Sequence, residues 1–400
     1  MFTDVRDRQR AALTVILCVS VGAAAAAIYY PPILADQYGD LGVHVSAAAE
    51  MSAKRVILVP HFFFHLLTIL LASSTGTALL SAGVALAAAA QGLTCLLLIA
   101  ILGYGNQTLG LSRPVGRETA LLAGFALSFV GPLSLFSYPN LYLGYPGISV
   151  AHSPTVILLR PAALALFIVT LRLLASRSWS QWTRLAAVAA TLVLVGGLTK
   201  PSYNVCLAPA LALMVVLPFR REGSLPKISR ATCALIVFSV TAITLWQVAF
   251  TYGPGADAGV TIAPLKVMAF WNHGSRGLTV IRIGLGLVFP IFVAVAYRKA
   301  AACSSDAFRL SWLAALVAIG SGCLLAETGR REMQGNLLWS MQVCLLILMT
   351  TSLAVFLSEE DAFHRGESAV VTKRTLVGAV LFLLHFMSGL IYVISGPRVS

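Results

Sequence analysis

The sequence predicts an all-α polytopic membrane protein, in which about 11 to 13 transmembrane helices and short interfacial helices on the outer face form one domain. That single integral membrane domain covers residues 1–400. Hydrophobic residues make up 58% of the chain and charged residues only 11%, whereas a soluble domain carries roughly 25% charged residues. The apolar residues are grouped in stretches long enough to span a membrane, and most Lys and Arg residues fall between them.

The first apolar stretch, residues 11–30, follows Arg6, Arg8 and Arg10. Its Ala-rich end is compatible with a cleaved signal peptide, but its length of roughly 20 residues favours a retained signal anchor with a cytoplasmic N-terminus. The other apolar stretches are residues 77–103, 120–136, 155–175, 185–198, 203–219, 231–251, 278–297, 310–326, 337–357 and 376–395.

Basic residues between these stretches set the orientation, because Lys and Arg accumulate in cytoplasmic loops. The loops alternate correctly when the N-terminus is also cytoplasmic, in a bacterial inner membrane. The same rule explains the net charge of +13 without nucleic acid, since no basic run exceeds two residues. The residues expected in cytoplasmic loops are Arg113, Arg117, Arg177, Arg184, Arg220, Arg221, Lys227, Arg230, Arg298, Lys299, Arg309, Arg365, Lys373 and Arg374.

Residues 55–72 fit this alternation in two ways. They are apolar but contain Pro60, His61 and His65. In one arrangement they lie on or dip into the outer face, which gives about 11 crossings. In the other they cross the membrane and residues 77–104 divide into two helices, which gives about 13 crossings.

The loops on the outer face are richer in Gly, Pro, aromatic and ionisable residues than connectors need to be, whereas the cytoplasmic loops are ordinary basic turns. This asymmetry predicts that binding or chemistry takes place on the outer side. The outer loops are residues 35–55, 137–154, 199–203, 252–277 and 326–336.

Asp40 and His44 stand out in the first outer loop. On an amphipathic surface helix over residues 39–51 they share one face at i,i+4 spacing, and Asp36 extends that face by a turn. A carboxylate held at the membrane with a His beside it suits general-base catalysis. The alternative is an interfacial helix with a solvated acidic face.

His61 and His65 are also spaced i,i+4. A two-His zinc pair needs a third ligand and an orienting second shell, and none is evident, so we expect hydrogen-bonded histidines and no metal or other cofactor. The seven cysteines have neither metal nor disulfide spacing and are expected to act as small packing residues.

Four further basic residues lie within apolar stretches or at their outer ends. Lys200 interrupts a long apolar stretch, and Arg160 lies within one, so each is expected to face a cavity or a partner, although an ordinary outer turn also explains Lys200. Arg330 and Arg331 suit a membrane-embedded phosphate, although local pairing with Glu327 and Glu332 explains them as well.

The segments DLGVH at 40–44 and PHFFFH at 60–65 resemble the first extracytoplasmic loop of the GT-C membrane glycosyltransferases. The segments YLGYPGISVAHSPT, TKPSY and ETGRREMQGN are similar to outer-loop motifs of bacterial members. Many members carry two adjacent acids, whereas here Gly39 precedes Asp40.

The resemblance implies an inverting transfer of a sugar from a polyprenyl-phosphate carrier to a glycan, glycolipid or protein acceptor in cell-envelope polysaccharide biosynthesis. Asp40 is the implied general base. The resemblance also implies that the hydrocarbon tail of the carrier lies in a groove between helices, in contact with membrane lipids. The residues assigned to substrate and donor binding are His44, His61, His65, Tyr142, His152, Arg160, Lys200, Trp271, His273, Glu327, Arg330 and Arg331.

Three other functions compete with this one. A transporter or lipid-linked glycan flippase would need ionisable groups near the bilayer midplane and an inverted repeat, but the ionisable groups cluster at one face. A glycan polymerase or ligase would centre on a large outer loop, and the largest here, residues 252–277, is short. A structural assembly subunit is the third.

Overall fold

The computed structural model describes residues 5–34, 40–111, 113–133, 153–217, 226–253, 259–360 and 372–395. Its α-helices are α1 (Val5–Leu34), α2 (Asp40–Lys54), α3 (Phe63–Thr75), α4 (Leu79–Tyr104), α5 (Asn106–Leu109), α6 (Arg117–Leu127), α8 (Pro154–Leu174), α9 (Trp179–Thr199), α10 (Asn204–Val216), α11 (Pro226–Thr251), α12 (Lys266–Phe270), α13 (Arg276–Ala296), α14 (Asp306–Leu324), α15 (Trp339–Glu360) and α16 (Lys373–Ser395). The strands β1 (Val260–Ile262) and β2 (Leu325–Glu327) and the 3-10 turns η1 (Ala301–Ser304), η2 (Gly329–Arg331) and η3 (Asn336–Leu338) connect them.

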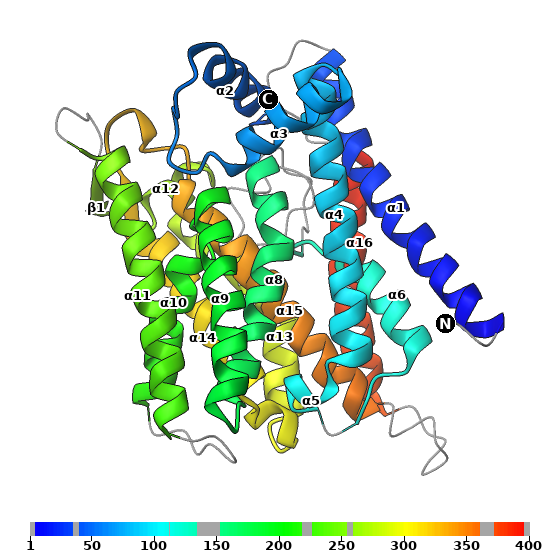
Figure 1. Ribbon diagram of the computed structural model, residues 1–400. Helices are drawn as coiled ribbons and strands as arrows, with labels where there is room; N and C mark the ends of the chain where they lie inside the picture. Colours follow the sequence, from blue (N-terminus) through cyan, green and yellow to red (C-terminus); the bar gives the residue numbers. More distant parts are fainter. Residues whose placement is uncertain are drawn as a thin grey trace.

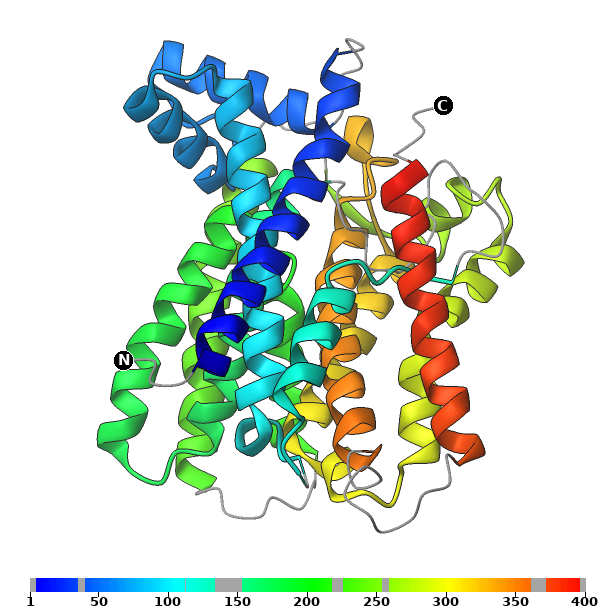
Figure 2. The same cartoon turned by 90° about the vertical axis from the view of Figure 1, so that its right-hand side faces the viewer.

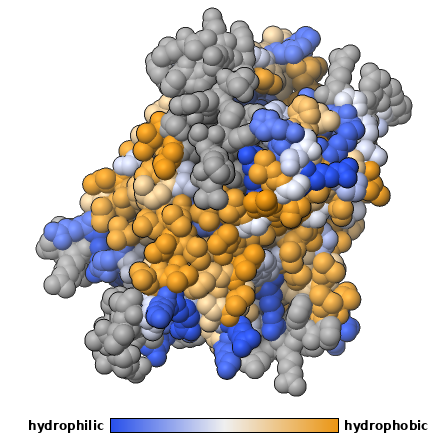
Figure 3. All heavy atoms as spheres, turned by 180° about the vertical axis from the view of Figure 1, so that it is seen from behind, coloured by the Kyte–Doolittle hydropathy of each residue, from blue (hydrophilic) through white to orange (hydrophobic). Residues whose placement is uncertain are grey.

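Long helices that run from one end of the molecule to the other form its body (Figure 1). Nine helices of the described ranges have the length and apolar composition to cross a membrane: α1, α4, α8, α9, α11, α13, α14, α15 and α16. Apolar side chains cover the middle of the rear face, and polar ones gather toward its two ends (Figure 3). The protein is therefore an all-α polytopic membrane protein, as the sequence predicts.

The long helices are fewer than the expected crossings. The expected crossing at 203–219 falls on α10, which has only 13 residues. The expected crossing at 120–136 falls on α6, which has 11 residues, and its last three residues lie outside the described range that ends at 133. α4 is continuous over 26 residues, whereas α2 and α3 lie together at one end of the bundle (Figures 1 and 2). Residues 55–104 thus have the arrangement expected for the smaller number of crossings.

We call the end that carries α2 and α3 the α2 end, and the opposite end, which carries α5, the α5 end (Figure 1). Between them, α15 forms the centre of the bundle and contacts α14, α13, α8 and α6. Almost every residue from Trp339 to Phe356 is buried, which is typical of a helix that is apolar on all sides. The first turn of α15 therefore has a fixed place at the α2 end.

The helix α6 ends at Leu127, part-way along the bundle (Figure 1), and 3-10-type hydrogen bonds follow, the last from the Val130 N–H to the Leu127 carbonyl at 3.4 Å. Lipid cannot satisfy the backbone groups released there, so neighbouring helices must do so. The Gly131 N–H donates to the His385 carbonyl at 3.0 Å, and the Gly131 carbonyl lies 2.8 Å from His385 Nδ1. Gln91 Nε2 donates to the Ser128 carbonyl at 3.2 Å. α16 and α4 thereby seal the end of α6.

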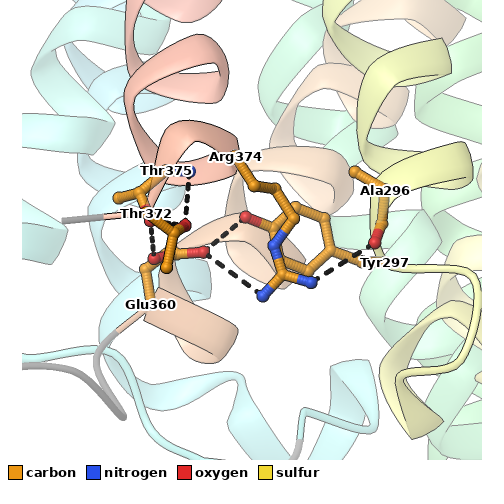
Figure 4. A network of polar contacts seen from close by, with 6 residues as sticks. All are labelled: Ala296, Tyr297, Glu360, Thr372, Arg374 and Thr375. Atoms are coloured by element: carbon orange, nitrogen blue, oxygen red, sulfur yellow. Dashed lines mark hydrogen bonds and ion pairs between the residues drawn. The ribbon is translucent and has the colours of Figure 1, made fainter. Parts of the chain in front are cut away.

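A polar network joins three helices at the α5 end (Figure 4). The Arg374 guanidinium lies 4.4 Å from the centre of the Tyr297 ring and 3.8 Å from the Glu360 carboxylate. The hydroxyls of Tyr297 and Thr375 donate to the same carboxylate. The network fixes α16 against α13 and α15 where these helices leave the apolar region.

Gly389→Ala should destabilise the protein, because α16 packs closely against the end of α6. An added Cβ would overlap the Phe129 carbonyl oxygen and lie 2.6 Å from the Gly131 nitrogen. We expect a loss of roughly 1–3 kcal/mol, as for other overpacked sites. Gly320→Ala is the control, since nothing lies within 4 Å of its added Cβ. In thermal unfolding in detergent, Gly389→Ala should have a lower midpoint temperature than the parent protein, whereas Gly320→Ala should not. Equal midpoints for the two variants would contradict the close packing of α16 against the end of α6.

Candidate active site

The helix α2 is held on the bundle by an apolar cluster. Leu41 of α2 and Phe64 of α3 pack with Ala87 of α4 and Ile157 of α8. Gly83 of α4 allows this close approach, because an added Cβ would lie 3.3 Å from the Leu41 side chain. This anchoring fixes Asp40 in the first turn of α2, where the free N–H groups of a helix favour a negative charge.

Lys200 follows the last residue of α9 and is 8% exposed. Its Nζ lies 3.5 Å from the Thr155 hydroxyl and 5.0 Å from the centre of the Trp339 ring. None of the ion pairs within 4.0 Å in the described ranges includes it. Burial lowers the pKa of Lys200 to about 8, although the negative charge of Asp40 raises it. The ammonium is thus a buried cation whose direct neighbours are neutral.

Three imidazoles lie beside this cation. His44 Nδ1 is 3.0 Å from His65 Nε2, and the rings of His44 and His61 have centroids 6.5 Å apart. Burial, and next the charge of Lys200, lower the pKa of His44 and of His61 well below 6.5. Burial lowers the pKa of His65 to about 4. All three rings are therefore neutral near pH 7 and present both donor and acceptor nitrogens.

No group of three or more His, Cys, Asp or Glu residues in the described part of the chain is arranged to hold a metal ion. The His44–His65 pair instead makes a direct hydrogen bond between ring nitrogens. The i,i+4 spacing pairs His65 with His61, whereas the ring hydrogen bond of His65 is to His44.

Glu327 is 4% exposed and its carboxylate is fully engaged. It accepts hydrogen bonds from the Tyr252 hydroxyl at 2.7 Å and from Asn336 Nδ2 at 2.5 Å, and Arg331 Nε lies 3.0 Å away. Burial and the hydrogen bond to Glu327 raise the pKa of Tyr252 to about 12. The charge of Arg331 lowers the pKa of Lys200, whereas the charges of Asp40 and Glu327 raise it.

The loop that carries Arg331 is pinned by a small sheet and by α12. β1 pairs with β2 in antiparallel fashion, with Val260 opposite Glu327. The Trp271 Nε1–H donates to the Met333 carbonyl at 3.0 Å, and Lys266 pairs with Glu332. Trp271, assigned to donor binding from the sequence, thus supports the Arg331 loop.

The structure brings Asp40, His44, His61, His65, Lys200, Glu327 and Arg331 to the α2 end but leaves other predicted residues elsewhere. Arg160 Nη1 donates to Gln91 Oε1 at 3.2 Å, on the side of α8 that faces α4. His273 is exposed in the turn before α13 and has a φ of 52°. Tyr142, His152 and the side chain of Arg330 lie outside the described residues.

Sequence reasoning did not single out Thr155, Tyr252, Asn336 or Trp339. Each lies at the start or the end of an apolar stretch that reaches the α2 end, and this position was the signal that could have found them. Comparison with protein-family models and with curated proteins found no match to this chain.

Lys200→Met should stabilise the folded protein, because a buried cation without a carboxylate partner is replaced by an apolar side chain of similar length. The pKa of Lys200 falls from 10.5 to about 8 on folding. Between these pH values the unfolded chain binds more protons, so the parent's free energy of unfolding rises with pH. The gain from Lys200→Met should therefore be largest below pH 8, of the order of 3 kcal/mol, and should shrink toward pH 10.5.

Unfolding midpoints measured in detergent across this pH range test the prediction. Lys266→Met is the control, because Lys266 is half-exposed and paired with Glu332. A gain for Lys200→Met that stays constant with pH would mean that its ammonium is not desolvated in the folded state.

Proposed function

We propose that the protein is an inverting GT-C-type glycosyltransferase that moves a sugar from a polyprenyl-phosphate carrier to a glycan, lipid or protein acceptor outside the cytoplasm. The observation that carries the proposal is the buried Lys200 ammonium, which lies beside Thr155 and Trp339 at the same end of the bundle as Asp40 and Arg331. A buried cation that no described carboxylate contacts within 4.0 Å is costly. An anionic ligand that enters from the membrane removes that cost.

A phosphate attached to a lipid fits this position, because its hydrocarbon chain holds it at the membrane surface. Lys200 supplies a point charge, and Arg331 supplies a guanidinium that Glu327 keeps in place. The neutral imidazoles of His44 and His61 add hydrogen-bond donors and acceptors for sugar hydroxyls without adding charge.

The reaction then needs a base on the other side of the anomeric carbon. Asp40 takes the proton from an acceptor hydroxyl, and the acceptor oxygen forms a bond to the anomeric carbon. The bond from that carbon to the phosphate oxygen breaks, and its electron pair leaves with the phosphate. Lys200 and Arg331 stabilise the charge that develops there. Attack opposite the leaving group inverts the anomeric centre.

Asp40 suits the role of base better than Glu327 does. The Glu327 carboxylate is occupied by Tyr252, Asn336 and Arg331. No hydrogen bond or ion pair between described residues occupies the Asp40 carboxylate. A base must be free to accept a proton from its substrate, so Glu327 is assigned to positioning Arg331.

Asp40→Asn should lower the transfer rate by roughly 10²–10⁴, the range for losing a general base, while fold and donor binding persist. Purified protein in lipid, incubated with a panel of radiolabelled polyprenyl-phosphate sugars, gives the rate. Glu50→Gln is the control, because Glu50 pairs with Lys54 on the exposed side of α2. An Asp40→Asn protein that is destabilised yet active would disprove the mechanism.

The bacterial inner membrane and an outward-facing α2 end are part of the same proposal. Arg113, Arg177, Arg298 and Lys373 lie at the α5 end or in connections there, which favours a cytoplasmic position for that end.

Cysteine labelling of intact cells tests this orientation in a Cys303→Ser background, since Cys303 lies in η1 at the α5 end. A membrane-impermeant maleimide should label His273→Cys at the α2 end and should not label Arg298→Cys, both positions being exposed. Labelling of Arg298→Cys alone would reverse the topology and place the site in the cytoplasm.

A further inference from the structure

The Lys200 ammonium lies over an aromatic ring. Its Nζ is 5.0 Å from the centre of the Trp339 indole, within the roughly 6 Å at which the face of a ring attracts a cation. The ion pairs formed at 4.0 Å or less among the described residues join other side chains. The ring therefore occupies a place next to the ammonium that a carboxylate could have taken.

Trp339 has a fixed position. It is the first residue of α15, the helix at the centre of the bundle, and it is 5% exposed. Three residues earlier, Asn336 Nδ2 donates to the Glu327 carboxylate at 2.5 Å. The short segment that ends in Trp339 is thus held by a buried acid on one side and by the central helix on the other. The ring is a rigid platform.

Lys200 is held from its other side by neutral groups. Its backbone N–H donates to the Gly196 carbonyl at 2.8 Å. Its Nζ lies 3.5 Å from the Thr155 hydroxyl, which in turn lies 3.0 Å from the Ser153 hydroxyl. These contacts orient the side chain without bringing a negative charge into contact with it.

A ring and a carboxylate have different consequences for an incoming anion. A carboxylate in contact with the ammonium would cancel its charge, and the anion would have to compete with it. A ring carries no net charge, and its quadrupole still favours the cation. The full charge of the ammonium then remains for the ligand.

We propose that Trp339 is a positioning residue, which keeps the Lys200 ammonium charged and in place for an anionic ligand without neutralising it. The proposal rests on the proposed function, since it takes the anion to be a phosphate carried by a lipid. Trp339 acts only through Lys200.

Several other groups act electrostatically on Lys200 or respond to its charge. They are Asp40 and His44 of α2, His61 of the α2–α3 connection, Glu327 of β2 and Arg331 of η2. Both imidazoles have a pKa well below 6.5, mainly because of burial. Burial lowers the pKa of Lys200 to about 8, so its charge changes in a pH range in which both imidazoles stay neutral.

Trp339→Leu tests the proposal by removing the ring. A labelled polyprenyl phosphate without sugar should bind this variant almost as tightly as the parent at pH 6.5. At pH 8 it should bind roughly fivefold more weakly, because losing the ring should lower the pKa of Lys200 by about one unit. Trp339→Phe keeps a ring and should restore most of the affinity. Trp312→Leu is the control, since Trp312 of α14 packs edge to face against Phe308 with ring centres 6.4 Å apart.

Three results would overturn the role of Trp339. One is an affinity that Trp339→Leu leaves unchanged at pH 8. Another is an equal loss at both pH values, which would indicate a change in the shape of the site. The third is a Trp339→Phe protein that binds as weakly at pH 8 as Trp339→Leu does.

A second measurement needs no ligand and separates this proposal from the proposed function. The stability gain from Lys200→Met should begin to shrink roughly one pH unit lower in the Trp339→Leu background than in the parent, because the folded protein then releases the Lys200 proton at lower pH. An unchanged pH dependence of that gain would overturn the pairing of ring and ammonium. A shifted dependence in a protein that binds no polyprenyl phosphate would overturn the proposed function and leave the pairing established.

Discussion

Hydrocarbon offers no hydrogen-bond partner, and this constraint explains how polar groups are distributed in the protein. Inside the bundle, polar side chains meet backbone or amide groups, as Gln247 meets the Gly197 carbonyl and Arg160 meets Gln91. The interrupted helix α6 is tolerated for the same reason, since α4 and α16 supply partners for its end. At the α2 end, the buried Lys200 ammonium has a hydroxyl and an indole ring as its direct neighbours, so an anion that binds there gains a charged partner.

The two acidic residues at the α2 end show how environment separates roles. Glu327 is buried on β2, where it accepts hydrogen bonds from Tyr252 and Asn336 and pairs with the Arg331 guanidinium. It therefore holds the Arg331 loop in place. Asp40 is held through the apolar contacts of its helix, whose buried residues lie on the side facing α4. Its position is fixed by packing and no partner among the described residues binds its carboxylate, which is the combination that the proposed role of general base requires.

The sequence was sufficient for the fold class, because that depends on the hydropathy along the chain. The local pair of Arg331 with Glu327 was among its alternatives, but pairings between distant segments were beyond it. Tyr252 and Glu327 are 75 residues apart, and nothing local shows that β1 and β2 bring them together. Arg160 was expected to face a cavity or a partner, and the helix rotation that turns it toward Gln91 depends on how α8 packs against α4. Trp271 was expected at the donor, whereas its indole N–H supports the Arg331 loop.

The position of the α2–α3 connection has a consequence for any lipid-linked substrate. Such a molecule has an apolar half and a charged half, and a membrane enzyme must bind both across a boundary where the dielectric environment changes steeply. Here one short segment ends in Phe62, which lines an apolar groove between α9 and α11, and carries His61, whose pKa is lowered by burial and next by the charge of Lys200. Under the proposed function, contacts with an apolar chain in this segment would be linked to the geometry at the phosphate. Binding energy gained far from the chemistry is useful to catalysis when it is linked to the transition state in this way.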